Sequence, residues 1–108
     1  MNNLNENISN LKSVIKKGDF ADARIICEKL MRDNQAHVEL NFLLGSIYNK
    51  LNLHQRAQEQ LENTLYLDPN CYNALVELSL FYEKIGEHKK ASNYRERAFR
   101  ISSKEMEP

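Results

Sequence analysis

A spacing of 34 residues constrains the fold of this sequence more than any other feature. The segment SIYNKLNLHQRA at residues 46–57 is followed 34 positions later by LFYEKIGEHKKA at residues 80–91. Both segments carry an aromatic residue, lysine, an aliphatic residue, a turn-forming residue, histidine and alanine in the same places. A fixed period of about 20–50 residues indicates a repeat protein, in which each copy folds as a small unit and the units stack.

The period divides most of the chain into three copies, at about residues 4–37, 38–71 and 72–105. Positions within a copy are counted here from its first residue. Position 20 is alanine and position 25 is glutamate in all three copies, whereas position 15 is glycine or asparagine. Glycine and asparagine most readily adopt the left-handed backbone conformation of a tight turn. We therefore expect three equivalent units in a single domain at residues 1–105, with a short polar tail at residues 103–108.

Each copy contains two helical patterns. In the second copy, apolar residues recur at intervals of three and four, which is one face of a helix: Leu40, Leu43, Leu44, Ile47, Tyr48 and Leu51. A second stripe follows Asn52 and stops before Pro69, because the residue before proline is disfavoured in the helical region. The same reasoning along the chain predicts six helices, at about residues 4–17, 20–33, 37–51, 54–67, 72–85 and 88–102.

Two further local features follow from this assignment. Asp19 and Asn70 are expected to cap the second and fifth helices, because short polar side chains accept hydrogen bonds from the free amides of a first turn. The alanine at position 20 is expected where two antiparallel helices cross, because only a small side chain permits a close approach.

The pattern resembles the tetratricopeptide repeat over nearly the whole chain. The second copy carries the residues that this family favours at defined positions: Leu44 and Gly45, Tyr48, Ala57, Leu61 and Pro69. It departs from the family at Asn41 and Thr64, and the first copy departs more, with Asn7 and Asn10 where apolar residues are usual. The resemblance implies an all-α fold, a right-handed superhelix of three helix-turn-helix repeats with six helices.

Composition excludes several classes of function. The 108 residues include 15 basic and 15 acidic side chains, so the formal net charge is zero. A general attraction to nucleic acid or to anionic lipid is therefore not expected. No apolar run approaches the roughly 18 residues that a membrane-spanning helix needs. The two cysteines are too few for a disulfide framework and favour a cytoplasmic location.

Candidate catalytic and metal-binding residues are few. His37, His54 and His88 have no His or Cys three or four positions away, whereas zinc requires three or four converging ligands. We interpret these histidines as residues of surface turns. The sequence contains no glycine-rich phosphate loop and no nucleophile motif. It therefore predicts a non-catalytic chain that has no metal site and no cofactor.

The resemblance implies a protein or peptide partner bound in a concave groove that the first helix of each repeat lines. The positions that face this groove in the family predict nine partner-binding residues: Lys12, Phe42, Ser46, Asn49, Lys50, Asn73, Val76, Leu80 and Lys84. Some family members clamp the terminal carboxylate of chaperones with basic and amide side chains. The matching residues here are Ile8, Lys12, Leu43, Asn73 and Glu77. Only Lys12 is basic, and Glu77 would repel a carboxylate, so this clamp is not expected.

Beside the peptide-binding hypothesis, the sequence offers one narrower family resemblance and two alternative functions. Segments such as HVELNFLLGSIYNKLN and ALVELSLFYEKIGEHKKA are similar to the repeat tail of bacterial chemoreceptor methyltransferases, which implies a docking domain of such an enzyme. Arg95 stands where an apolar residue would pack on a following helix, so the array is expected to end there. The exposed last helix, including Phe99, then suggests dimerisation as a self-assembling scaffold. Helical repeats that bind RNA are a further alternative, against which the period and the charge both argue.

Overall fold

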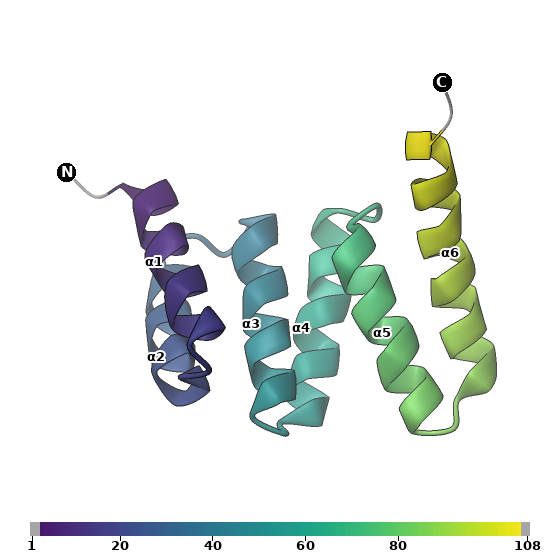
Figure 1. The fold of residues 1–108 in the computed structure, drawn as a ribbon, viewed down its shortest axis with the longest axis horizontal. Helices are drawn as coiled ribbons and strands as arrows, with labels where there is room; N and C mark the ends of the chain where they lie inside the picture. Colours follow the sequence, from purple (N-terminus) through teal and green to yellow (C-terminus); the bar gives the residue numbers. More distant parts are fainter. Residues whose placement is uncertain (1–2, 107–108) are drawn as a thin grey trace.

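The computed structural model describes residues 3–106, with side chains for residues 3–104. Six α-helices and no strands form this part of the chain: α1 (Leu4–Lys16), α2 (Phe20–Met31), α3 (Val38–Lys50), α4 (His54–Leu67), α5 (Tyr72–Lys84) and α6 (His88–Met106). Consecutive helices pair as three antiparallel hairpins, and the hairpins stand side by side along the long axis of the molecule (Figure 1). The predicted all-α class and the six helices are confirmed.

The turns inside the three hairpins have the same backbone geometry. Gly18, Asn52 and Gly86, which occupy position 15 of their copies, have φ angles of 84°, 62° and 83°. A positive φ is strained for most residues but readily adopted by glycine, and asparagine tolerates it better than other side chains. The repeated turn residue therefore marks the point in each hairpin at which the chain reverses direction.

The last helix differs from its prediction. α6 has 19 residues and continues through Met106, so residues 103–106 are helical, whereas a polar tail was expected from residue 103. The segment Ser-Ser-Lys-Glu-Met at residues 102–106 contains no glycine or proline, and lysine, glutamate and methionine favour helices. Nothing in that sequence stops the helix. Residues 107–108 of the predicted tail lie outside the described part of the chain.

The predicted caps are also corrected. Asp19 does occupy the N-cap position of α2, but its side chain makes no capping hydrogen bond. The N-cap of α5 is Cys71, and Asn70 precedes it. The Asn70 amide instead donates to Asp68 Oδ1 at 3.0 Å. Asp68 therefore organises a turn through its own side chain, which is a common role of aspartate in turns. The cap of α5 thus lies one residue later than expected, whereas the helix itself begins at Tyr72 as predicted.

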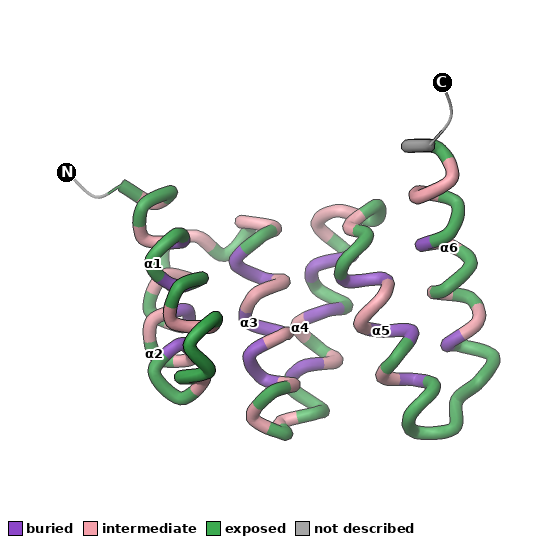
Figure 2. The backbone as a smooth tube through the Cα atoms, viewed as in Figure 1, coloured by how far each residue is buried: buried purple, intermediate pink, exposed green. Residues whose placement is uncertain are grey.

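The core lies between the helices and is densest in the middle of the stack (Figure 2). One cluster joins α1, α2 and α3 and includes Ala57 of α4, and a second joins α4, α5 and α6. Ala23, Ala57 and Ala91 at position 20 are fully buried, which is the environment expected where two helices cross. Helices α3 and α4 also approach closely at Gly45, where an added Cβ would lie 2.9 Å from Cγ of Leu61.

Candidate functional site

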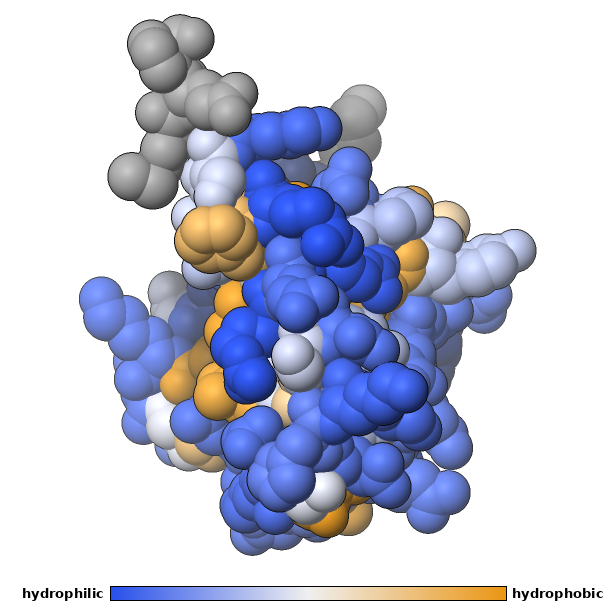
Figure 3. Space-filling model, turned by 90° about the vertical axis from the view of Figure 1, so that its right-hand side faces the viewer, coloured by the Kyte–Doolittle hydropathy of each residue, from blue (hydrophilic) through white to orange (hydrophobic). Residues whose placement is uncertain are grey.

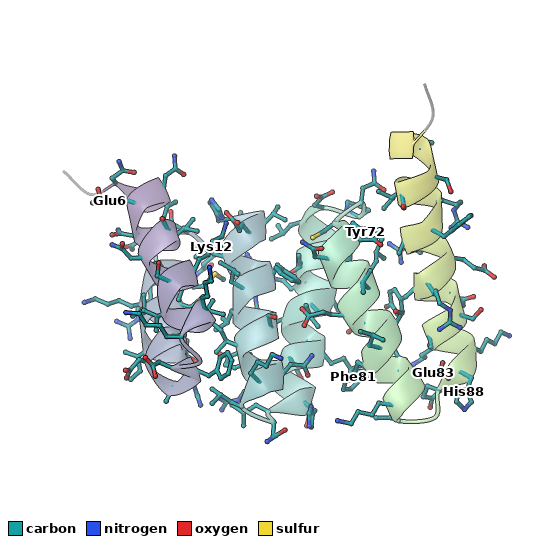
Figure 4. The ribbon with its side chains drawn as sticks, viewed as in Figure 1. Glu6, Lys12, Tyr72, Phe81, Glu83 and His88 are labelled. Carbon is teal, nitrogen blue, oxygen red and sulfur yellow. The ribbon has the colours of Figure 1, made fainter. Side chains whose placement is uncertain are left out.

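The first helices of the three hairpins share one surface, which we call the α1/α3/α5 face and which contains the nine predicted partner-binding residues. Two contacts connect these helices. Lys12 Nζ on α1 lies 2.5 Å from Glu39 Oε2 on α3, and Lys12 is seen between these two helices in Figure 4. Ser46 Oγ on α3 donates to Glu77 Oε1 on α5 at 3.2 Å. Side chains from the three helices therefore meet on the same side of the stack.

The nine predicted residues differ in exposure. Five are exposed: Lys12, Lys50, Asn73, Leu80 and Lys84. Four are half-buried: Phe42, Ser46, Asn49 and Val76. Phe42 and Val76 pack against the second core cluster, whereas Leu80 keeps 64% of its surface exposed. Leu80 is thus the most accessible apolar side chain of the nine, with Phe42 and Val76 lower in the surface.

Several polar members of this face already have a partner within the chain. Lys12 pairs with Glu39, and Ser46 donates to Glu77. Asn49 Oδ1 lies 3.3 Å from His54 Nδ1 across the turn between α3 and α4. Lys50, Asn73 and Lys84 make no hydrogen bond or ion pair with the described residues, although the positive charge of Lys50 acts on Glu77. Asn73 and Lys84 are therefore the polar side chains most available to a ligand on this face.

The repeated histidine, at position 17, has the same kind of contact in two repeats. His88 Nδ1 lies 3.0 Å from Glu83 Oε1, and Figure 4 shows these side chains together at the turn between α5 and α6. The pair corresponds to His54 and Asn49 one repeat earlier. His54 and His88 thus connect the start of the second helix of their hairpins to the end of the first. No group of three or more His, Cys, Asp or Glu side chains within residues 3–104 is placed to hold a metal ion.

Glu77 is the residue of this face that sequence reasoning considered only as an obstacle to carboxylate binding. Its Oε2 atom is buried and has no hydrogen-bond partner among the described residues. Burial raises the pKa of the Glu77 carboxyl, while the hydrogen bond from Ser46 and the positive charge of Lys50 oppose that rise. The centre of the face therefore carries an acidic group at a position where carboxylate-binding relatives would need a basic one.

A hydrogen bond between neighbouring repeats explains the glutamate at position 25. The Tyr48 hydroxyl donates to Glu28 Oε2 at 2.6 Å, and the Tyr82 hydroxyl donates to Glu62 Oε1 at 2.8 Å. In both cases the tyrosine is at position 11 and the glutamate belongs to the preceding repeat. The repeated glutamate was visible in the sequence, but its partner lies 20 residues away and in another copy, so the periodicity alone did not reveal the bond.

The family of the chain follows from a comparison with known repeats. The model of the tetratricopeptide repeat (TPR) family matches residues 38–71 and 72–105, with the same boundaries as the second and third predicted copies. This chain belongs to the tetratricopeptide repeat family. The match leaves out residues 4–37, the copy in which Asn7 and Asn10 replace apolar residues.

Several known proteins are similar to this TPR chain in sequence or in structure. The BBSome complex member BBS4 of Bos taurus is 37% identical over 65 residues, which are 60% of this chain and 12% of BBS4. The second TPR domain of Spaghetti (RPAP3), solved with the HSP90 peptide SRMEEVD, has a TM-score of 0.82 at 14% identity and covers 89% of each chain. PcrH, solved with the chaperone-binding region of PopD, has a TM-score of 0.85 at 16% identity, covering 93% of this chain and 75% of PcrH. The two structures establish the fold.

Other features of this TPR chain lie apart from the α1/α3/α5 face. Burial raises the pKa of the Cys27 thiol to about 12, which leaves it protonated and unreactive at neutral pH. No helix among the described residues has the length and apolar character to cross a membrane. One cavity of about 750 Å³ opens between α1 and α2, and another of about 440 Å³ lies between α6 and the turn that joins α4 to α5.

The Tyr48–Glu28 bond predicts a particular dependence of stability on pH. Burial, followed by the bond to Glu28, raises the pKa of Tyr48 from 10.0 to about 12, so its contribution to stability is present below pH 10 and lost as the pH approaches 12. The same bond is the main cause that lowers the pKa of Glu28 from 4.5, so that contribution is present above pH 4.5 and lost on acidification. The folded state is therefore expected to lose stability at both extremes.

The variant Tyr48→Phe tests this expectation. Near neutral pH it should lower the free energy of unfolding by about 1 kcal/mol, the usual net contribution of one hydrogen bond. It should also weaken the change in stability below pH 4.5 and above pH 10, measured by urea denaturation at several pH values. Tyr66→Phe is the matched control, because Tyr66 is 84% exposed. Equal effects of the two substitutions would contradict the assignment.

Proposed function

We propose that this TPR chain is a protein-interaction module that binds an extended or helical peptide segment of a partner protein on the α1/α3/α5 face. The observation that carries the proposal is the exposed Leu80 on α5, which shares this face with half-buried Phe42 and Val76 and with amide and lysine side chains. An apolar partner side chain would contact Leu80 and Phe42, while Asn73 would hydrogen-bond to the partner backbone. The RPAP3 domain solved with an HSP90 peptide and PcrH solved with the chaperone-binding region of PopD support the proposal.

This face does not suit a partner segment that is held by its C-terminal carboxylate. Of the matching clamp residues, Ile8 is buried in the core and Lys12 is paired with Glu39. Glu77 adds a carboxylate at the centre, where a negatively charged terminus would be repelled. We therefore expect the partner to contribute apolar side chains and backbone groups, and not an acidic C-terminus like that of the HSP90 peptide.

The double variant Phe42→Ala with Asn49→Ala tests the site. Dodecapeptides selected from a random phage library on the wild-type chain would be labelled and measured by fluorescence anisotropy. The double variant should weaken their binding by about tenfold or more, because it removes an apolar contact and an amide from the face. Circular dichroism should show unchanged helicity. Leu80→Ala should weaken binding in the same direction, and its exposed side chain has little role in the core.

The matched control removes an aromatic residue and an asparagine elsewhere. Tyr66 on α4 and Asn93 on α6 are both exposed and lie outside the α1/α3/α5 face. The variant Tyr66→Ala with Asn93→Ala should bind the selected peptides like the wild type. If instead this control loses binding while the Phe42, Asn49 and Leu80 variants retain it, the partner site lies on another surface and the proposed site is wrong.

Self-assembly through α6 remains the second candidate function. Phe99 is 71% exposed on this helix, and Ile85 is 56% exposed just before it. Figure 3 shows the α6 side of the molecule as mostly hydrophilic, with hydrophobic atoms in separate places. A dimer interface normally has a continuous apolar centre, which this side lacks in Figure 3. The peptide-binding role is therefore favoured over self-assembly. Self-assembly predicts a dimer mass in static light scattering that Phe99→Glu reduces to a monomer.

A narrower version of the proposal makes this chain the docking domain of a chemotaxis-type methyltransferase in the cytoplasm. The sequence resemblance of its repeats supports that version, while neither the family model nor the similar proteins reported above adds to it. The length of the parent reading frame tests it directly. A methyltransferase domain encoded upstream in the same frame is the expected result, and a frame without one would contradict this version while leaving the peptide-binding role intact.

A further inference from the structure

The charge of the molecule is unevenly distributed, and the excess of positive charge lies on the last helix. α6 contains six lysines and arginines and two glutamates, a net charge of +4, although the whole chain is neutral. The basic residues at its N-terminal end are Lys89 and Lys90, and those at its C-terminal end are Arg100 and Lys104. Because the chain as a whole is neutral, the positive charge of α6 points to a function of that helix and not of the whole surface.

The C-terminal half of α6 forms one wall of a cavity of about 440 Å³. Because α6 continues through Met106, it projects beyond the neighbouring α5, and the turn between α4 and α5 lies beside it (Figure 1). Six residues line the cavity: Pro69, Asn70, Arg97, Arg100, Ile101 and Lys104. Three of the α6 residues lie within the predicted part of the helix, and the extension beyond residue 102 adds Lys104 to the wall of the cavity.

Three cations converge on the cavity, since Arg97, Arg100 and Lys104 are spaced by three and four residues and share one helix face. Arg97 is held in place, because its Nη2 donates to the carbonyl oxygen of Pro69 at 3.3 Å and its guanidinium lies 5.5 Å from the Tyr94 ring centre. Arg100 and Lys104 are exposed and form no ion pair with the residues that the structure describes. No acidic side chain is among the lining residues.

We propose that this cavity binds an acidic peptide segment of a partner, in which aspartate or glutamate flanks an apolar residue. The carboxylates would pair with Arg97, Arg100 and Lys104, because guanidinium and carboxylate groups form strong charge-assisted hydrogen bonds. The apolar side chain would contact Ile101 and Pro69 on the inner surface. The site lies at the C-terminal end of the stack and is separate from the α1/α3/α5 face, so this inference does not depend on the proposed function.

The cavity favours a peptide over the other anionic partners. Single-stranded nucleic acid is bound largely by stacking bases on aromatic side chains, and none of the six lining residues is aromatic. An anionic membrane surface attracts clustered basic residues but does not need a hollow with an apolar floor. A short segment that combines carboxylates with an apolar side chain matches both the charge and the shape.

The inference can be tested with a fluorescein-labelled nonapeptide in which glutamates flank a central leucine, measured by fluorescence anisotropy. The variant Arg100→Gln with Lys104→Gln should weaken its binding by about tenfold or more, because it removes two of the three cations. The matched control is Lys89→Gln with Lys90→Gln, which removes the same charge from the other end of α6. The control should change the affinity by less than about twofold, because its charges lie far from the cavity and are screened.

Other measurements separate the inference from its alternatives. A peptide with glutamines in place of the glutamates should bind much more weakly, and Phe42→Ala with Asn49→Ala should bind the acidic peptide like the wild type. The inference is overturned if both charge variants lose binding equally, if the glutamine peptide binds as well, or if the Phe42 and Asn49 variant loses binding. It is also overturned if a thymidine dodecamer or phosphatidylserine vesicles bind this end of α6 more tightly than the peptide.

Discussion

Replacement of Ala57 by leucine is expected to lower the free energy of unfolding by about 1–3 kcal/mol, the usual cost of overfilling a packed core. Ala57 is fully buried on α4, in the cluster that also contains Ile47 and Tyr48 of α3. One turn further along α4, Leu61 already lies so close to Gly45 that even a methyl group there would collide. The two helices therefore have no room to accept a larger side chain, and urea denaturation followed by circular dichroism measures the loss.

The variant Ala21→Leu is the appropriate control for this experiment. Ala21 lies within α2 but is exposed, so leucine there adds the same atoms without entering the core. Its free energy of unfolding should stay within about 0.5 kcal/mol of the wild type, as for most surface substitutions. If Ala57→Leu were as stable as Ala21→Leu, the close packing of α3 on α4 would be wrong.

The second large effect is expected at Asn41, a fully buried polar residue of α3. Its Nδ2 donates to the carbonyl oxygens of Gln35 and His37 at 2.9 and 2.8 Å. Its Oδ1 accepts from Gln60 Nε2 at 2.5 Å and from Asn63 Nδ2 at 2.8 Å. Because each bond contributes roughly 0.5–1.5 kcal/mol, Asn41→Ala should lower the free energy of unfolding by about 2 kcal/mol or more.

An exposed asparagine provides the comparison. Asn93 lies in the interior of α6 and faces solvent, so Asn93→Ala should be neutral or slightly stabilising because alanine favours helix. Thermal denaturation of both variants gives the difference. A loss at Asn41 no greater than at Asn93 would mean that the four hydrogen bonds add nothing to stability, and the connection between the loop before α3 and helix α4 would need another explanation.

The fold could be predicted from the sequence because the repeat places the same requirements in every copy. Position 15 needs a turn residue and position 20 needs a small residue, and both needs are physical consequences of a helical hairpin. The family match at residues 38–71 and 72–105 has the boundaries that the spacing of 34 predicts. Helix ends were predicted less well, because one side chain such as Asp68 can shift a cap by a residue.

Polar contacts between repeats were not predictable in the same way. Asn41 was identified only as a departure from the family, and its four partners come from the preceding loop and from α4. Glu77 was judged by its charge, whereas its burial and its bond to Ser46 depend on how α3 and α5 pack. Such contacts depend on the distance between helices, which a repeating pattern of residue types does not specify.

The nine candidate partner-binding residues illustrate the same limit. Family positions identify the side of the stack on which these residues lie, but not whether a side chain is free for a ligand. Ser46 and Asn49 already have partners inside the chain, while Asn73 is exposed about two helical turns before Leu80. Their role in binding is a prediction that the peptide experiments decide.

The link from tyrosine to the glutamate of the preceding repeat gives the stack a direction in which it can be lengthened. Glu96 is the corresponding acceptor on α6, and it has no tyrosine partner among the described residues, so an appended hairpin with tyrosine as its eleventh residue would find its acceptor ready. A second copy of residues 4–105 joined directly after residue 105 would instead bring Val14 to that place, and valine has no hydroxyl to donate. Concatemers built from it would therefore be weakest at each junction, and Val14→Tyr is the change that would strengthen them.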